Sequence, residues 1–263
     1  MQFVDTHCHL YYKSYQEDIQ EVVNRSVAAV VERIIVPGLD LATSHAAIAL
    51  AERFEGVFAA VGVHPGDVHS FQSSDLDAFK AFLEHPKVVA VGEIGLDYYH
   101  RIDNKNLQKD VLVQFLYLAR DYNKPVILHS RESLTDLLIV LQHYLQEKDY
   151  RELTGVFHSF EGNLQDAHKI IDLGFYLGVG GPLTYKNSSK KHGLFSKIDL
   201  TRVLLETDGP FLPPQKYRGQ RNEPAYIPLI AEKVAELQLC DIKDVATQTT
   251  RNVEKLFSLD QTS

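Results

Sequence analysis

The stretch PVILHSRESLTDLLIVLQ, residues 125–142, contains one full repeat of the pattern that decides the fold. Pro125–His129 is a short apolar run, which is typical of a buried strand. Leu134, Leu137 and Leu138 then recur at the spacing that places side chains on one face of a helix. The stretch therefore predicts a strand that is followed directly by an amphipathic helix.

The same alternation extends along the rest of the chain. Ile19, Val22 and Val23 again have helical spacing, and apolar runs separate such helices throughout. Strands that alternate with helices form parallel βαβ units, and eight of them predict a closed (β/α)8 barrel. An open, doubly wound sheet is the alternative. The predicted strands are Gln2–Thr6, Arg33–Pro37, Val57–Val63, Val88–Glu93, Pro125–His129, Gly155–His158, Phe175–Gly180 and Val203–Glu206.

The segment after the last predicted strand is rich in Pro and Gly. Gly209–Pro214 and Tyr217–Pro224 predict a long loop at the mouth of the barrel. Two closing helices are expected near Tyr226–Leu237 and Asp241–Phe257. No change of composition marks a domain boundary, so we expect residues 1–263 to form one domain.

Composition restricts the setting in which the protein works. Cys8 and Cys240 are the only cysteines, too few for a disulfide framework, which favours a reducing compartment. No apolar run approaches the roughly 20 residues of a membrane span, and the N-terminus does not resemble a signal peptide. We therefore expect a cytoplasmic monomer without an obligate protein partner. The net charge of -8 argues against a broad basic groove for nucleic acid.

The first predicted strand leads into two closely spaced histidines in DTHCH, Asp5–His9. Alternate side chains of a strand face the same way, so His7 and His9 should both point into the barrel, with Cys8 toward the helices. Two such imidazoles can clamp a metal ion, although a buried, hydrogen-bonded pair fits the same pattern.

Four other predicted strands also end in residues that bind metals. Glu93 ends the fourth strand, and His129 and His158 end the fifth and sixth. The eighth ends in Glu206, and Asp208 follows at the alternate position of the same face; Glu206 lies deeper and is expected to be a supporting residue or a partner in the core. A carboxylate at the end of an apolar strand is costly to bury unless it is paired or bound to a cation.

The joint placement of these side chains predicts a metal centre. Barrel enzymes build their active sites at the C-terminal ends of the strands. Imidazoles together with carboxylates suit Zn²⁺ or Mn²⁺, and six donors exceed the needs of one tetrahedral ion, so we expect two divalent ions about 3.5–4 Å apart. The predicted ligands are His7, His9, Glu93, His129, His158 and Asp208.

Across nearly its whole length the sequence resembles the TatD family of metal-dependent DNases. Seven motifs occur in the family's order, which makes the resemblance specific for the superfamily. They are DTHCH (Asp5–His9), GVHPG (Gly62–Gly66), VGEIGLDYY (Val91–Tyr99), PVILHSR (Pro125–Arg131), VFHSF (Val156–Phe160), LLETDGP (Leu204–Pro210) and RGQRNEP (Arg218–Pro224).

The resemblance implies a particular division of the ligands and a particular activity. One ion would be held by His7, His9, Glu93 and Asp208, and Glu93 would bridge to a second ion held also by His129 and His158. Family members are associated with hydrolysis of DNA, often in the 3′→5′ direction and with Mg²⁺ or Mn²⁺.

Water activated between the two ions would then attack a phosphodiester of single-stranded DNA or RNA. Asp208 is predicted to accept the proton of this water, because it ends a strand beside the expected cluster.

The sequence departs from the family at Gly66, where many members carry a second His. It departs again in GVGGPLTY, Gly178–Tyr185, which is similar to a subgroup less often tied to nuclease activity.

Four further residues are predicted to contact substrate. His64 ends the third strand and Arg131 follows the fifth, and both can hold a phosphate. Arg218 and Asn222 lie in the long loop after the eighth strand. Each of the four is also compatible with a purely structural or solvent-exposed role.

Two other functions fit parts of this pattern. A deaminase, lactonase or amidase of the amidohydrolase type also uses a paired-histidine first strand and a final Asp, but many binuclear members bridge their metals with a modified Lys rather than a Glu. A non-catalytic metal-binding protein would be expected to lack one or more ligands, and all six are present here. The sequence therefore favours a metal-dependent phosphodiesterase.

Overall fold

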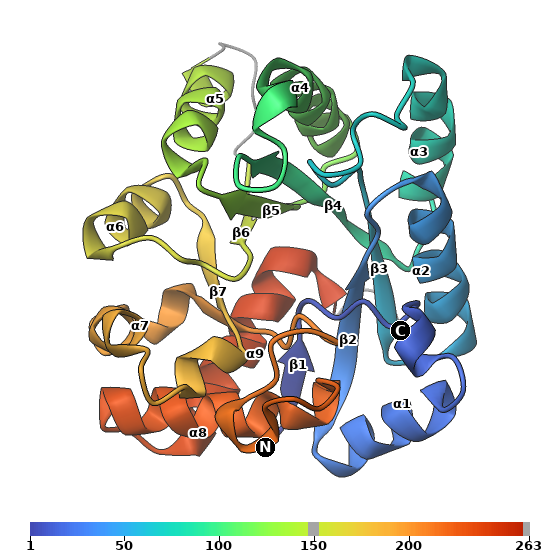
Figure 1. Cartoon of the computed structure of the whole chain (residues 1–263). Helices are drawn as coiled ribbons and strands as arrows, with labels where there is room; N and C mark the ends of the chain where they lie inside the picture. The colour runs from blue at the N-terminus through green and yellow to red at the C-terminus, as the bar shows by residue number, and fades with distance from the viewer. Residues whose placement is uncertain (147–152, 260–263) are drawn as a thin grey trace.

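The computed structural model describes residues 1–146 and 153–259. Its strands pair in parallel and in chain order, with helices around the outside (Figure 1). This arrangement is the predicted (β/α)8 barrel and excludes the open, doubly wound sheet. The strands are β1 (Phe3–Asp5), β2 (Val31–Pro37), β3 (Val57–Val61), β4 (Val88–Asp97), β5 (Val126–Arg131), β6 (Gly155–Phe157), β7 (Tyr176–Val179) and β8 (Val203–Leu205).

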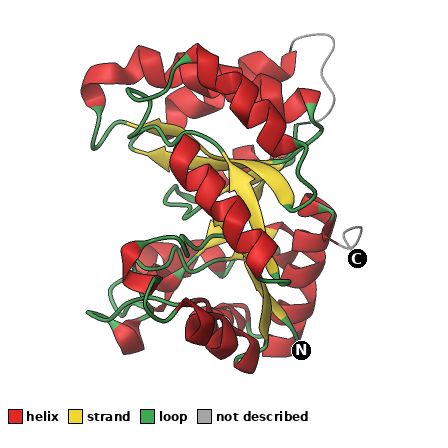
Figure 2. Cartoon of the chain, turned by 90° about the vertical axis from the view of Figure 1, so that its right-hand side faces the viewer, coloured by secondary structure: helices red, strands yellow, loops and turns green. Residues whose placement is uncertain are grey.

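Helices connect the strands and flank the sheet on both sides in the view of Figure 2. The α-helices are α1 (Ile19–Ala28), α2 (Leu41–Arg53), α3 (Leu76–Leu83), α4 (Lys105–Asp121), α5 (Leu134–Gln146), α6 (Leu164–Asp172), α7 (Ser189–Phe195), α8 (Ile227–Gln238) and α9 (Ile242–Phe257). The 3-10 helices are η1 (Lys13–Tyr15), η2 (Ser73–Asp75), η3 (Ile102–Asn104), η4 (Gly181–Thr184), η5 (Leu200–Arg202), η6 (Gln215–Tyr217) and η7 (Pro224–Tyr226). Across the described residues, no helix has the length and apolar character of a membrane span.

Two apolar cores give the barrel its shape. One lies between the strands and the outer helices, and the other lies inside the barrel. In the inner core, strand residues such as Ile127 and Leu204 pack with Val253, Leu256 and Phe257 of α9. Helix α9 therefore closes the N-terminal end of the barrel, which leaves the C-terminal end open for a site.

The seam between β1 and β8 is made by the segments that carry predicted ligands. Thr6 N donates to Leu205 O at 3.1 Å, and Asp208 N donates to His7 O at 2.8 Å. The buried carboxylate of Asp5 accepts from Thr207 N at 2.9 Å. These bonds close the barrel and fix His7 and Asp208 beside each other.

All eight strands differ from their predicted bounds by up to four residues at an end, and two of these differences affect the predicted ligands. Strand β1 ends at Asp5, because the Asp5 carboxylate, rather than a backbone carbonyl, accepts the Thr207 N–H at this point of the seam. Strand β4 continues past Glu93 to Asp97, because Gly95 and Asp97 stay paired with β5. His7 and His9 thus follow β1 rather than lie within it, and Glu93 lies within β4.

Candidate metal centre

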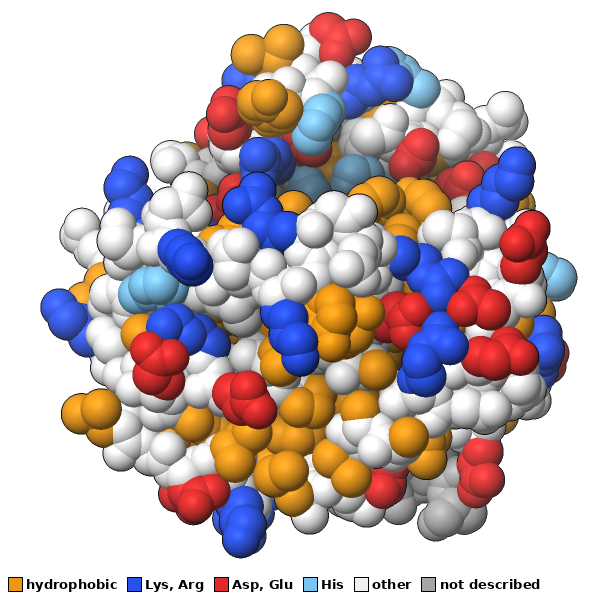
Figure 3. Space-filling view, turned by 60° about the horizontal axis from the view of Figure 1, so that its bottom comes forward, with side chains coloured by type: hydrophobic (Ala, Val, Ile, Leu, Met, Phe, Trp, Pro, Cys, Tyr) orange, Lys and Arg blue, Asp and Glu red, His pale blue; other side chains and the backbone are white. Residues whose placement is uncertain are grey.

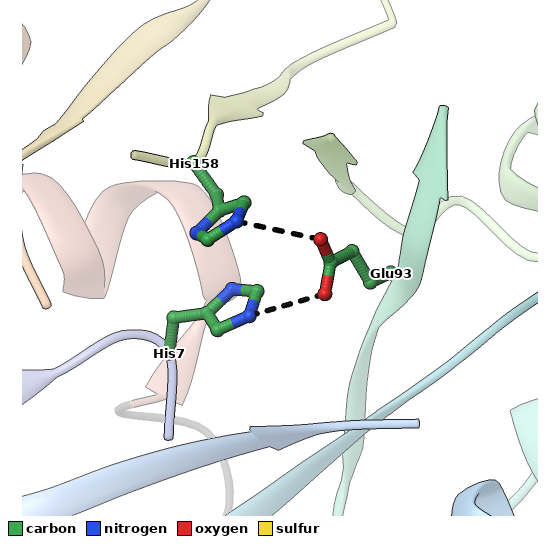
Figure 4. Close-up of side chains that lie close together, drawn as sticks. All are labelled: His7, Glu93 and His158. Atoms are coloured by element: carbon green, nitrogen blue, oxygen red, sulfur yellow. Dashed lines mark ion pairs between the residues drawn. The ribbon is translucent and has the colours of Figure 1, made fainter. Parts of the chain in front are cut away.

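The six predicted ligands lie together at the open end of the barrel. Glu93 lies within β4, at an irregularity of its pairing with β5, and His129 lies within β5, while the turns that follow β1, β6 and β8 hold the others. Figure 4 shows His7 and His158 on one side of the centre, both directed at the carboxylate of Glu93. Sequence segments more than 200 residues apart therefore contribute to one cluster of imidazoles and carboxylates.

His7 and His9 turn the same ring nitrogen toward each other. Their Nε2 atoms are 3.3 Å apart, and both side chains are buried. Tyr11 Oη donates its proton to Pro37 O, so it accepts from His9 Nδ1 at 2.8 Å. In the neutral ring this leaves the lone pair of His9 Nε2 free to bind a cation. Tyr11 was not among the predicted site residues.

Glu93 lies at the middle of the cluster. Its Oε2 is 3.2 Å from His7 Nε2, while its Oε1 is 2.8 Å from His129 Nδ1 and 3.4 Å from His158 Nε2. The side chain is almost completely buried. Each of its two oxygens thus faces a different set of imidazoles, which is the arrangement that a bridging carboxylate requires.

Two further carboxylates lie behind the inner histidines. Asp97 Oδ2 is 3.4 Å from His129 Nε2, and Glu206 Oε1 is 3.4 Å from His158 Nδ1. A carboxylate on the outer nitrogen of an imidazole orients the ring and strengthens the inner nitrogen as a ligand. Glu206 was predicted as a supporting residue from the sequence. Asp97 was not, although it follows Glu93 at the even spacing of one strand face.

We expect Asp97→Asn to weaken metal binding and turnover by roughly 10- to 100-fold, because His129 loses the charge that orients it. Isothermal titration calorimetry measures the affinity for metal, and kcat measures turnover. Asp110→Asn on the exposed face of α4 is the matched control. Unchanged affinity and turnover in Asp97→Asn would show that the contact is not needed to orient His129.

Asp208 occupies the side of the cluster nearest His7 and His9. Its Oδ1 is 3.5 Å from His9 Nε2 and 3.9 Å from His7 Nε2. Its backbone is left-handed, with φ of 58°, which is uncommon for a residue other than Gly and is held here by the bond to His7 O. The side chain is 18% exposed, so it borders the open side of the centre, whereas Glu93 is 3% exposed.

The carboxylates make the centre favourable for positive charge. Burial lowers the pKa of His158, but the charges of Glu93 and Glu206 outweigh it and raise that pKa to about 10. Burial raises the pKa of Glu93, but the imidazoles of His158 and His7 outweigh it and hold the pKa well below its usual range. A divalent cation can neutralise the same carboxylates and accept the imidazole lone pairs, so this donor set fits a metal.

The donor atoms form three groups that could each hold an ion, and within each group the atoms lie within 4.8 Å of one another. All six predicted ligands belong to these groups, and His64 joins them. The groups are His7, His9 and Asp208; His7, Glu93 and His158; and His64, Glu93 and His129.

His64 differs from the other histidines in its hydrogen bonding. Its Nδ1 accepts the N–H of Gly66 at 3.0 Å, and its Nε2 is 3.8 Å from Glu93 Oε1. Burial and the nearby His129 lower the pKa of His64 to about 3, so the ring is neutral and carries its proton on Nε2. A side chain at Gly66 would crowd the ring, since an added Cβ would lie 3.0 Å from Nδ1. His64 is therefore suited to donate a hydrogen bond rather than to bind a metal.

Arg131 is the last residue of β5, and Arg218 lies on the exposed loop that follows β8. Arg131 Nη1 is 2.8 Å from Glu161 Oε2, and its guanidinium lies over the ring of Tyr99. The Arg218 guanidinium lies 4.7 Å from the ring centre of Tyr185. In residues 1–146 and 153–259, neither arginine makes a hydrogen bond or ion pair with the six ligands. Their contact with substrate stays a prediction.

Asn222 is completely buried in the loop that follows β8. Its Nδ2 donates to Thr207 O and Phe211 O, both at 2.7 Å, and its Oδ1 accepts from Glu223 N. The side chain thus spans both ends of the turn that contains Asp208. This geometry favours a role in holding Asp208 in place over direct contact with substrate.

We expect Asn222→Ala to lower the free energy of unfolding by about 1–3 kcal/mol, because two buried carbonyls lose their donor. Urea denaturation measures the change, and Asn187→Ala at an exposed position of the β7 loop is the control. Stability equal to that of the control would mean that other groups satisfy the carbonyls of Thr207 and Phe211.

Comparison with known proteins identifies the family. The model of the family described as TatD related DNase matches residues 4–258. The chain belongs to the TatD family. It is 38% identical to YabD of Bacillus subtilis, an uncharacterized metal-dependent hydrolase, over 97% of this chain and 98% of that protein. The family membership confirms the resemblance seen in the sequence motifs.

Two other relatives extend the comparison. The crystal structure of YjjV, a TatD homologue from Escherichia coli, superposes with a TM-score of 0.91 at 35% identity and covers 98% of both chains. A 3′-5′ ssDNA/RNA exonuclease, TatD of Citrobacter rodentium, is 32% identical over 93% of this chain and 94% of that protein. The chain is thus a metal-dependent hydrolase of the TatD family with residues placed to bind metal.

Proposed function

We propose that this TatD protein is a two-metal phosphodiesterase that removes nucleotides from the 3′ end of single-stranded DNA or RNA. The position of Glu93 carries the proposal, because its two oxygens face His7 on one side and His129 and His158 on the other. Pairs of divalent ions about 3.5–4 Å apart recur in phosphatases and nucleases, and a carboxylate between two sets of imidazoles could be shared by such a pair. The relative from Citrobacter rodentium supports the choice of substrate.

The ligand groups support the following assignment. His7, His9, Glu93 and Asp208 would hold one ion, and Glu93, His129 and His158 would hold the other. When bound, such ions lower the pKa of water and stabilise negative charge on phosphoryl oxygens. Zn²⁺, Mn²⁺ and Mg²⁺ are the candidate ions, since imidazoles favour the first two and carboxylates accept all three.

Asp208 is the residue best placed to accept a proton from the attacking water. Burial raises its pKa, but the hydrogen bond from His9 and the nearby imidazoles outweigh burial and lower it, so the carboxylate is ionised at neutral pH. Its side chain borders the open side of the centre, whereas that of Glu93 is almost completely buried. An ionised carboxylate at hydrogen-bonding distance of the water is the requirement for a general base.

His64 completes the site on the opposite edge. Its Nε2–H is the free donor of a neutral ring, and its side chain is 18% exposed, as is that of Asp208. A donor at this edge can bind a phosphoryl oxygen and stabilise charge that develops on it. His64 and Asp208 would therefore hold the scissile phosphate and direct the water from two sides of the centre.

Hydrolysis of a 5′-labelled single-stranded oligonucleotide tests the proposal. The protein is stripped of metal and then assayed after addition of Mg²⁺, Mn²⁺ or Zn²⁺. We expect metal-dependent products that shorten one nucleotide at a time. Protein that binds two equivalents of metal but leaves the oligonucleotide intact would contradict the proposal, and turnover of an amide or lactone would then support the amidohydrolase alternative.

A further inference from the structure

Two neighbouring loops at the open end of the barrel carry an unusual charge. Residues 180–192 follow β7 and residues 209–222 follow β8. The loops are joined by Gln215 N, which donates to Thr184 Oγ1, and by Tyr185 Oη, which donates to Pro213 O. Neither segment contains Asp or Glu, although the whole chain has a net charge of -8. Their basic residues are Lys186, Lys190, Lys191, Lys216, Arg218 and Arg221.

Two of these cations are used within the fold. Lys191 Nζ donates to Phe160 O, and Arg221 pairs with Asp18 and Glu223. The other four are exposed, and none has a carboxylate partner within residues 1–146 and 153–259. We define the basic loop face by these four residues, which are Lys186, Lys190, Lys216 and Arg218.

An exposed aromatic surface lies beside the metal centre, on the loop after β8 that also carries Lys216 and Arg218. Phe211 follows Asp208 in the β8 loop and is 43% exposed. Its ring is 5.2 Å from that of Tyr12 and 6.3 Å from that of His9. Aromatic rings at such a site stack on nucleic acid bases of any identity. In Figure 3, histidines lie recessed in a hollow of the surface, with Lys and Arg side chains on part of its rim.

The other side of the centre lacks such an excess of positive charge. A cavity of about 580 Å³ extends from His158 between the loops after β5 and β6. It is lined by four carboxylates, which are those of Glu132, Asp136, Glu161 and Asp166. Lys109, Arg131 and Lys169 pair with Asp136, Glu161 and Asp166, and Lys105 also lines the cavity, so this side offers no excess of positive charge for a phosphate. A polyanion is therefore favoured more on the side of the basic loop face than on this side of the centre.

We propose that a single-stranded nucleic acid extends from the metal centre across the basic loop face, with a base near the cleaved phosphate stacked on the ring of Phe211. The proposal rests on the proposed function and specifies its substrate as a chain of several nucleotides. Phosphates beyond the cleaved bond pair with Lys186, Lys190, Lys216 and Arg218. These residues bind the strand and do not touch the reacting atoms.

Binding of an octathymidylate with phosphorothioate linkages, which resist cleavage, tests the basic loop face. The variant replaces Lys186, Lys190, Lys216 and Arg218 with Gln, and fluorescence anisotropy gives Kd over a range of salt. For single strands, each phosphate contact contributes about 0.7 to the slope of log Kd against log salt concentration. We therefore expect this slope to fall by about 3 in the variant, and Kd at low salt to rise at least about tenfold. Kd for a dithymidylate should change by less than about twofold.

A matched variant tests whether binding depends on the position of the basic residues or only on the net charge of the protein. Lys197, Lys243, Arg251 and Lys255 are exposed on segments at the closed end of the barrel, and changing all four to Gln removes the same charge. We expect this control to bind the octamer with nearly the wild-type slope. An equal loss of slope in both variants, or no loss in either, would overturn the proposal.

A second pair of variants tests base stacking on the aromatic surface. Phe211→Leu removes the ring but keeps an apolar side chain, and we expect Kd for the octamer to rise about 5- to 100-fold. Leu212→Ala is the control, because Leu212 is the next residue and is also 43% exposed. Equal effects of the two changes would contradict base stacking on Phe211.

The outcomes also separate this inference from the proposed function. Wild-type protein that binds the octamer with the expected slope but hydrolyses no phosphodiester would disprove the proposed function and support the strand path. A different pair of results would disprove the strand path but leave the proposed function standing. In that case the wild type would hydrolyse the dithymidylate, and the variant of the basic loop face would bind the octamer as tightly as the wild type.

Discussion

Replacing Asp208 with Asn is expected to lower kcat for oligonucleotide hydrolysis by about 10²- to 10⁴-fold, which is the usual contribution of a general base. Asn keeps the size of the side chain and one oxygen toward His9, but it cannot accept a proton. Because the backbone of residue 208 is held by His7 O, the seam between β1 and β8 should be retained. Single-turnover hydrolysis at saturating metal measures the effect on the chemical step.

Asp172→Asn, at the exposed end of α6, is the control for this substitution. Metal content must be measured beside turnover, since Asp208 is also a proposed ligand. Near wild-type turnover with full metal occupancy would show that another group accepts the proton. A loss of turnover that is restored at high metal concentration would assign Asp208 to metal binding alone.

Replacing Glu93 with Gln should have the largest effect on metal binding. The amide has nearly the same shape, but His7, His129 and His158 no longer face a negative charge. We expect the loss of at least one of two metal equivalents per chain and a fall in kcat of more than about 10³-fold, because both ions would share this carboxylate. Elemental analysis after dialysis measures the metal content.

Thermal unfolding provides a readout that does not depend on activity. A ligand that binds only the folded state stabilises it, so Mn²⁺ should raise the Tm of the wild type but raise that of Glu93→Gln much less. Glu84→Gln, at the exposed end of α3, should respond to Mn²⁺ as the wild type does. If Glu93→Gln keeps two equivalents and the full Tm shift, Glu93 is not the bridging ligand.

The barrel could be predicted from the sequence because its signals are local. Each strand is a short apolar run, each helix has one apolar face, and the eight repeats follow each other without interruption. The ends of β1 and β4 were harder to predict because they depend on partners far away in the sequence. The Asp5 carboxylate, which bonds to Thr207 across the seam, is the example at β1.

The clustering of the candidate ligands could also be predicted, since parallel strands bring their C-terminal ends to one face. His7 and His9 converge as expected, although they lie beyond the end of β1. The supporting contacts could not be predicted in this way. Which nitrogen of a ring faces inward depends on neighbours distant in the sequence, as the contact of Asp97 with His129 and the bond from Tyr11, which supports His9, to Pro37 O show.

Loop residues gave the least information in the sequence. Asn222 lies in a polar, exposed-looking segment, yet it is buried because Arg221 ties the loop to Asp18 before α1. The Arg218 side chain, four positions earlier, stays exposed. The charge of a loop residue such as Arg218 can be read from the sequence, but the direction of its side chain depends on how the whole loop packs.

Anomalous diffraction from a crystal grown with Mn²⁺ tests the central claim most directly, because it locates the ions without reference to a substrate. We predict two peaks, one on each side of Glu93, about 3.5–4 Å apart. The first should lie against His7, His9 and Asp208, and the second against His129 and His158. A single ion that does not contact Glu93, or two ions held elsewhere, would contradict the account.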